Sequence, residues 1–141
     1  MSTNAWDNAR LMYARDNCAK QMGIEVIEMG DGFALLTMTI TEAMLNGHQT
    51  CHGGQLFTLA DTAFAYACNS QGLAAVASGC SIEFLRPGKA GDRLKAVAHV
   101  RQQGRQTGVY DIEIINQDEK TLALFRGRAH RIGTTLSGEK L

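Results

Sequence analysis

The stretch CHGGQLFTLADTAFAYACNSQG, residues 51–72, decides which fold we expect for this chain. Its apolar residues recur at helical spacing from Leu56 to Ala67, a Gly-Gly pair precedes them, and Gly72 follows. These features predict a helix over residues 55–70. Polar residues interrupt this stretch too often for a segment exposed to lipid. We therefore expect a long helix buried in the core of the protein.

The segments on either side of this helix are typical of one short helix and six strands. An opening helix is expected over residues 5–21, from apolar residues at roughly helical intervals. Alternating apolar and polar residues predict strands over residues 24–29, 33–40, 74–85, 94–101, 107–116 and 121–132. Short connections among the last four strands favour an antiparallel meander. Because the central helix is so apolar, the sheet must wrap around it. We expect an α+β fold.

The composition of the chain limits the number of domains, the classes of partner and the location that we expect. The chain has 141 residues, 45% of them hydrophobic, which predicts a single domain over residues 1–141. Lysine plus arginine number 14 and so do aspartate plus glutamate, so we expect no nucleic-acid partner. Residues 1–7 lack the pattern of a secretory signal, which favours a cytoplasmic protein without a membrane partner. Four widely spaced cysteines predict reduced, mostly buried thiols and no metal site.

Asp61 is the only formally charged residue between Glu42 and Glu83, and it lies in the middle of the most apolar helix. An ionised carboxylate there is costly unless it is hydrogen-bonded, paired or part of a site. Desolvation raises the basicity of such a group, which suits a general base or nucleophile near neutral pH. The alternative is a structural role, in which Asp61 bonds buried groups such as the hydroxyls of Thr58 or Thr62.

The sequence His52-Gly53-Gly54 stands at the start of the same helix. The first amides of a helix lack internal partners and lie at the positive end of its dipole, so they can stabilise the oxyanion of an acyl transfer. The alternative is a simple loop-to-helix turn made by two glycines. His52 has a supporting role in either case, because a histidine at this place caps or orients the turn.

Gly53 and Asp61 cannot act on one carbonyl within one chain. Eight residues of helix separate them by roughly 12 Å along the axis. If two chains pair about a twofold axis with their helices antiparallel, Gly53 of one chain approaches Asp61 of the other. The catalytic hypothesis therefore predicts at least a homodimer with two composite sites.

Four motifs resemble those of the PaaI-type hotdog thioesterase family. They are residues 46–48 (NGH), 51–57 (CHGGQLF), 59–61 (LAD) and 84–88 (FLRPG), and the resemblance covers residues 18–132. It implies the hotdog fold, in which an antiparallel sheet wraps around one long central helix. It also implies dimers joined edge to edge and a homotetramer made of two dimers.

The resemblance also implies roles for individual residues. Gly53 would give the oxyanion amide, Asn46 would help to hold the thioester carbonyl or the water, and Asp61 of the partner chain would activate water or attack directly. Related enzymes place a hydroxyl in the strand after the helix, where this chain has Ala77, so Thr62 is the substitute. The remaining substrate-binding candidates are His52 and Gly54. For the phosphates of coenzyme A they are Arg86 and Lys89, with Arg126 and Arg128 on one strand face as a second choice.

The resemblance implies an acyl-CoA thioesterase that hydrolyses aryl-acetyl or hydroxyphenylacetyl thioesters in phenylacetate catabolism. Coenzyme A would be part of the substrate, and we expect no separate cofactor. A non-catalytic hotdog domain that binds acyl-CoA as a sensor or carrier is the alternative, and it predicts that Asp61 is dispensable. A hotdog dehydratase is a third possibility, but the sequence offers no acid and histidine pair suited to that reaction.

Overall fold

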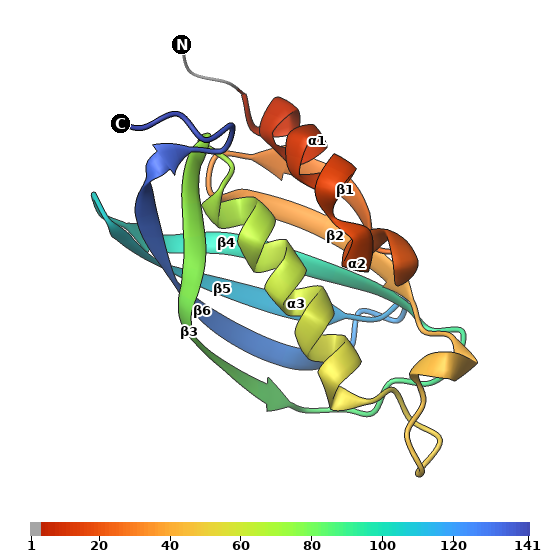
Figure 1. The fold of residues 1–141 in the computed structure, drawn as a ribbon. Helices are drawn as coiled ribbons and strands as arrows, with labels where there is room; N and C mark the ends of the chain where they lie inside the picture. The colour runs from red at the N-terminus through yellow and green to blue at the C-terminus, as the bar shows by residue number, and fades with distance from the viewer. Residues whose placement is uncertain (1–3) are drawn as a thin grey trace.

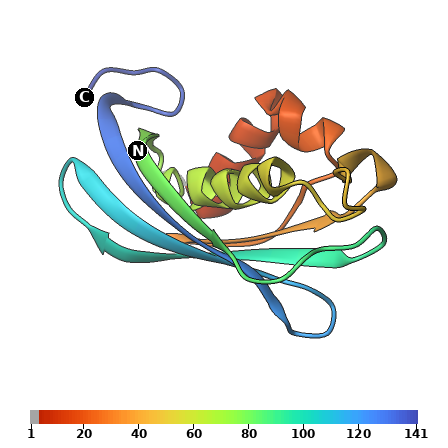
Figure 2. The ribbon, with the colours of Figure 1, turned by 90° about the horizontal axis from the view of Figure 1, so that it is seen from below.

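The computed structural model describes residues 4–141 as a curved antiparallel sheet that holds one long helix in its hollow (Figures 1 and 2). The long helix is α3, and a shorter helix, α1, lies on the same side of the sheet. The fold is thus the wrapped α+β arrangement that the sequence predicts. In chain order the elements are α1 (Ala5–Arg15), α2 (Asn17–Gln21), β1 (Glu25–Gly30), β2 (Phe33–Thr39), the 3-10 turn Glu42–Met44, α3 (Gly53–Cys68), β3 (Leu73–Phe84), β4 (Arg93–Gln103), β5 (Thr107–Ile115) and β6 (Thr121–Thr135).

The strand order is β1-β2-β4-β5-β6-β3, so the expected meander of the last four strands is only partly right. Strands β4, β5 and β6 do form a meander, but β3 pairs with β6 and not with β4. The connector after β3 crosses the end of the sheet, bonded by Leu85 N–H to the Leu122 carbonyl at 2.8 Å and by Gly91 N–H to the Ile40 carbonyl at 2.8 Å. It thereby carries the chain from the end of β3, beside β6, to the start of β4, beside β2.

The core lies between α3 and the concave face of the sheet. The Phe64 ring packs against Tyr110 and Phe125, with ring centroids 5.7 and 5.9 Å away. Gly127 of β6 makes this possible, because a Cβ there would lie 2.7 Å from the Phe64 ring. Each large apolar side chain buried in this way contributes about 1.5–3 kcal/mol. The buried residues of α3 are Leu56, Leu59, Ala60, Ala63, Phe64, Tyr66, Ala67 and Cys68.

The opening helix is broken, although the sequence predicts one helix over residues 5–21. The break falls at Asp16, whose side chain accepts a hydrogen bond from the Ala19 N–H at 3.0 Å and so caps α2. The Tyr66 hydroxyl of α3 donates to the second carboxylate oxygen at 3.2 Å. Burial and the Asp16 charge raise the pKa of Tyr66. The cap therefore also links the opening segment to the central helix.

The two edges of the sheet differ. Edge strand β1 has a register shift between Val26 and Glu28, and α1 packs beside it. The other edge strand, β3, has 12 residues, of which only Glu83 is charged, and none is lysine or proline. It leaves Val76 and Phe84 about half exposed, at 50% and 52%. Long apolar edges of this kind pair readily with another strand.

The thiols are less buried than expected. All four cysteines are free, and Cys51 and Cys68 are buried, but Cys18 and Cys80 are exposed. Cys80 lies on the open edge strand β3, which explains its exposure in a single chain.

Candidate active site

Helix α3 begins with one backbone amide that has no acceptor in the described part of the chain. His52 is the N-cap, and its Nδ1 accepts a hydrogen bond from the Gly54 N–H at 3.2 Å. The His52 carbonyl accepts from the Gln55 N–H at 2.9 Å and the Leu56 N–H at 3.3 Å. Within residues 4–141 no acceptor binds the Gly53 N–H. The positive end of the helix therefore offers the Gly53 amide to a ligand, and the Gly54 amide is already used by His52.

Gly53 is glycine because of space and not because of backbone conformation. Its φ is not positive, so an alanine could adopt the same backbone. A Cβ at this position would lie only 3.0 Å from Cζ of Phe84, the last residue of β3. Beside this contact lies a hollow of about 340 Å³, whose lining includes Gly53, Leu56, Phe84, Leu85 and Arg86.

Asp61 has neither an ion-pair partner nor a hydrogen-bond partner in the described part of the chain. The two hydroxyl groups that could bond Asp61 in a structural role donate their protons to other acceptors. Thr58 donates to the Gly54 carbonyl at 3.0 Å, and Thr62 donates to the Thr58 carbonyl at 2.6 Å. The carboxyl is half-buried, and this burial raises the pKa of Asp61 above its ordinary value. A desolvated, unpaired carboxylate is the form that accepts a proton most readily.

Two thiols lie near the Asp61 carboxylate. Burial is the main cause that raises the pKa of both Cys68 and Cys80, and the charge of Asp61 adds to it in each case. Cys80 of β3 pairs with Gly127 of β6, which packs against Phe64 of α3. Side chains that pair across two strands share a face of the sheet, so Cys80 faces α3. The carboxylate is thus bordered by weakly polar groups that cannot neutralise it.

The other candidate residues lie around the start of α3 or are used elsewhere. The Asn46 side-chain oxygen accepts from the His48 N–H at 2.9 Å and from the Thr50 N–H and hydroxyl at 3.2 Å each, so it shapes the loop before the helix. Arg86 lines the hollow beside Gly53, whereas Lys89 is exposed and does not. The hydroxyl proton of Thr62 is bonded within α3, which leaves it poorly placed to orient a water.

Gly53 and Asp61 lie on one helix, separated by roughly 12 Å along its axis. A single chain therefore does not bring them together, and the shared site stays a prediction. Sequence reasoning missed Phe84 and Cys80 as neighbours of these two residues. The signal that could have found them is the alternation Cys80, Ile82, Phe84, which places all three on one face of β3.

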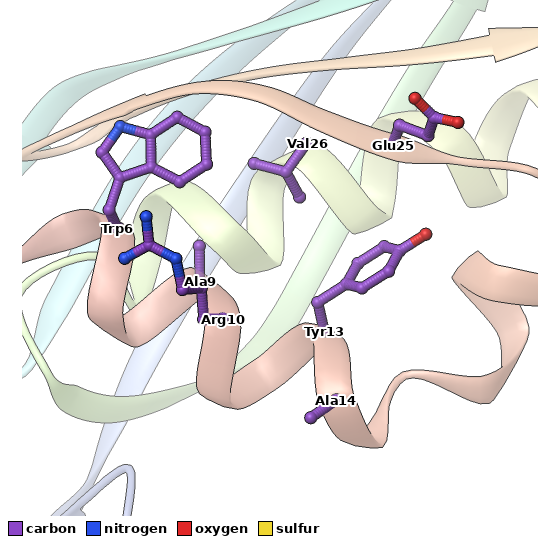
Figure 3. A pocket seen from close by; sticks show the side chains of 7 residues that line it. All are labelled: Trp6, Ala9, Arg10, Tyr13, Ala14, Glu25 and Val26. Atoms are coloured by element: carbon purple, nitrogen blue, oxygen red, sulfur yellow. The ribbon is translucent and has the colours of Figure 1, made fainter.

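Two hollows elsewhere in the described chain, one between α1 and β1 and one on the outer face of the sheet, have neither Gly53 nor Asp61 in their linings. A groove of about 520 Å³ lies between α1 and β1, where Trp6 and Tyr13 extend toward the strand that carries Val26 (Figure 3). On the outer face of the sheet, Arg126 binds Asp111 through two hydrogen bonds of 2.6 and 2.8 Å.

Among residues 4–141 no group of His, Cys, Asp and Glu side chains could hold a metal ion, and no helix there is long and apolar enough to cross a membrane.

Comparison with known proteins identifies the family. The sequence model of the thioesterase superfamily matches residues 48–123, more than half of the chain. The chain is 70% identical over 139 residues to the acyl-coenzyme A thioesterase PaaI of Escherichia coli, and 99% of each chain is covered. The structure of E. coli PaaI, from the phenylacetic acid degradation operon, has a TM-score of 0.92 and 72% identity, covering 93% of this chain and 95% of that chain.

A more distant structure is similar over most of its length. It is a hypothetical thioesterase of Streptococcus pneumoniae with coenzyme A, with a TM-score of 0.76, 30% identity, and coverage of 84% of this chain and 88% of that chain. The strand order, the wrapped helix and these matches agree. The chain therefore belongs to the thioesterase superfamily and has its hotdog fold.

Proposed function

We propose that the chain is an acyl-CoA thioesterase of phenylacetate catabolism, which releases aryl-acetyl or hydroxyphenylacetyl groups from coenzyme A. The observation that carries this proposal is the half-buried Asp61, which has a raised pKa and no partner within the described residues. The name of the E. coli relative and the operon of its structure supply the pathway. The S. pneumoniae structure contains coenzyme A, which supports the same substrate class.

The proposed chemistry needs an oxyanion donor and a base. The Gly53 N–H hydrogen-bonds the thioester oxygen, where negative charge develops in the transition state. The Asp61 carboxylate takes a proton from water, the resulting hydroxide adds to the carbonyl carbon, and the tetrahedral intermediate collapses to the free acid and the coenzyme A thiolate. Direct attack by Asp61, with hydrolysis of the resulting anhydride, needs the same two groups. No cofactor enters either route, because coenzyme A is part of the substrate.

The proposal includes a homodimer joined through β3. This strand is the long edge with one charged residue, and pairing with β3 of a second copy would cover its exposed Val76, while Phe84 at the end of the strand stays open to the hollow beside Gly53. A twofold axis beside β3 and perpendicular to α3 would make the α3 helices of the two chains antiparallel, which would bring Gly53 of one toward Asp61 of the other. The exposed Leu124, on the outer face of the sheet, supports a further contact that would make a tetramer.

The remaining roles in the proposal follow from position. Arg86 at the rim of the hollow would bind a phosphate of coenzyme A, and Lys89, further along the same turn, could assist. Asn46 would present its side-chain NH2 group, because its oxygen is bonded within its own loop. His52 and Gly54 would act indirectly, by holding the first turn of α3 in place. We also propose a cytoplasmic location, where coenzyme A thioesters are made and consumed.

A thiol-release assay tests the function against the sensor or carrier alternative. Wild type and Asp61→Asn are compared on phenylacetyl-CoA, hydroxyphenylacetyl-CoA and straight-chain acyl-CoAs. We expect wild type to prefer the aryl-acetyl substrates and Asp61→Asn to lose at least about 10²-fold in kcat. Equal rates for the two proteins would refute the role of Asp61. Binding of acyl-CoA by both, with no turnover by either, would establish the sensor or carrier instead.

A further inference from the structure

The ring of Phe84 lies against the Gly53 α-carbon. An alanine Cβ at Gly53 would be 3.0 Å from Cζ of the ring and 3.4 Å from both Cε atoms, so the tip of the ring faces the start of α3. Phe84 pairs across the sheet with Ala123, which is completely buried. Paired residues share a face of the sheet, so Phe84 projects toward the same side as α3. The ring is therefore next to the free Gly53 amide.

Phe84 is nevertheless 52% exposed. In the described part of the chain it has no aromatic partner, unlike Phe57 and Phe64, which both pack on Phe125. It forms a wall of the hollow beside Gly53, together with the apolar side chains of Leu56 and Leu85. An exposed aromatic ring at the mouth of a hollow, beside an unpaired amide, marks a place where an apolar group of a ligand can be buried.

We propose that Phe84 determines the acyl specificity of the site, by offering its ring to an aryl group whose thioester oxygen binds the Gly53 N–H. This inference rests on the proposed function and adds the residue that selects the acyl group. Aromatic pairs prefer offset or edge-to-face geometries, with centroids about 4.5–7 Å apart. The methylene of an aryl-acetyl group lets its ring rotate into such a geometry while the carbonyl stays at the amide.

An aliphatic acyl group gains less from the same wall. It buries apolar area against Phe84, but it has no ring whose charge distribution complements that of Phe84. Replacing Phe84 with leucine keeps an apolar wall and removes the ring. The variant should therefore weaken discrimination between aryl and aliphatic substrates more than it weakens hydrolysis in general.

The experiment measures kcat/KM for phenylacetyl-CoA and hexanoyl-CoA with wild type, Phe84→Leu and Phe84→Tyr. We expect Phe84→Leu to lower the ratio of the two values about three- to tenfold and Phe84→Tyr to keep it within about twofold. Ile132→Ala is the matched control, because Ile132 is 53% exposed on β6 and is not part of the site, so its ratio should equal that of wild type. Light scattering compares the assembly of all four proteins.

A second measurement needs no variant. Cyclohexylacetyl-CoA has nearly the shape of phenylacetyl-CoA without its aromatic ring, and wild type should hydrolyse it with a kcat/KM about three- to tenfold lower. Equal values of kcat/KM for phenylacetyl-CoA and cyclohexylacetyl-CoA would overturn the role of Phe84. An equal loss of kcat/KM on phenylacetyl-CoA and hexanoyl-CoA, in a correctly assembled Phe84→Leu, would overturn it as well. Failure of wild type to hydrolyse any of the thioesters would instead refute the proposed function.

Discussion

Replacing Gly53 with proline removes the one amide at the start of α3 that lacks an acceptor in the described residues. Gly53→Ala is the matched variant, because it adds a Cβ at the same place but keeps the N–H. The fold should accept proline here. Gly53 is the first residue of α3, a position that proline favours, and His52 has φ of −59° and ψ of 134°, the extended backbone required before a proline.

The two variants should differ because only one removes the hydrogen bond to the oxyanion. A Cβ at position 53 meets Phe84 at 3.0 Å, and since that side chain is 52% exposed it can move aside. We therefore expect Gly53→Ala to lose roughly tenfold or less in kcat, because a small displacement of the substrate is the only cost. Loss of an oxyanion donor typically costs about 10²–10³ in kcat, so Gly53→Pro should be lower by about this factor than Gly53→Ala.

The assay is steady-state hydrolysis of phenylacetyl-CoA, with the thermal midpoint of each variant as the control for folding. Both variants should unfold within a few degrees of wild type, because a substitution in the first turn that suits the backbone changes the stability by about 1 kcal/mol or less. Equal losses of kcat in Gly53→Pro and Gly53→Ala would show that the N–H has no catalytic role, and would refute the reasoning.

Two further predictions concern stability. Because burial raises the pKa of Asp61 in the folded state, the folded protein binds this proton more tightly than the unfolded chain, and stability falls as pH rises from the ordinary Asp value through the folded one. Asp61→Asn should therefore be inactive yet more stable than wild type in urea at pH 7, with this advantage shrinking toward about pH 4; a variant less stable than wild type at pH 7 would argue against the desolvation. His52→Ala removes the cap on the Gly54 N–H and should lower the free energy of unfolding in urea by about 1 kcal/mol. His52→Asn should keep the cap and the stability, and equal stability of the two variants would argue against the cap.

The sequence was sufficient for features that depend on local pattern. The existence of α3, the cap by His52 and the exceptional position of Asp61 all follow from residues within one helical segment, although α3 spans Gly53–Cys68 and not the predicted residues 55–70. The break between α1 and α2 could not be predicted in this way. Asp16 caps α2 and also accepts a hydrogen bond from Tyr66, which lies 50 residues further along the chain. Such a partner becomes visible only when the elements have been packed.

The strand order and the residues that line the site also could not be predicted from the sequence. Connection length favoured pairing of β3 with β4, but the connector crosses the sheet end and leaves β3 beside β6. The neighbours of Gly53 and Asp61 depend on the register of that pair, which shifts between Ala77 and Gly79. A shift of one residue moves side chains to the other face. The alternation along β3 could place Cys80 and Phe84 on one face of that strand, but only the structure shows that this face borders Gly53 and Asp61.

The central claim is that each active site combines Gly53 of one chain with Asp61 of its partner. Complementation tests it, by mixing inactive Asp61→Asn chains with inactive Gly53→Pro chains that carry different tags. A heterodimer contains one site with both groups intact, and half of the dimers in an equal mixture are heterodimers. The account predicts recovery of about one quarter of wild-type activity. No recovery, when tag purification proves that the chains have mixed, would contradict it.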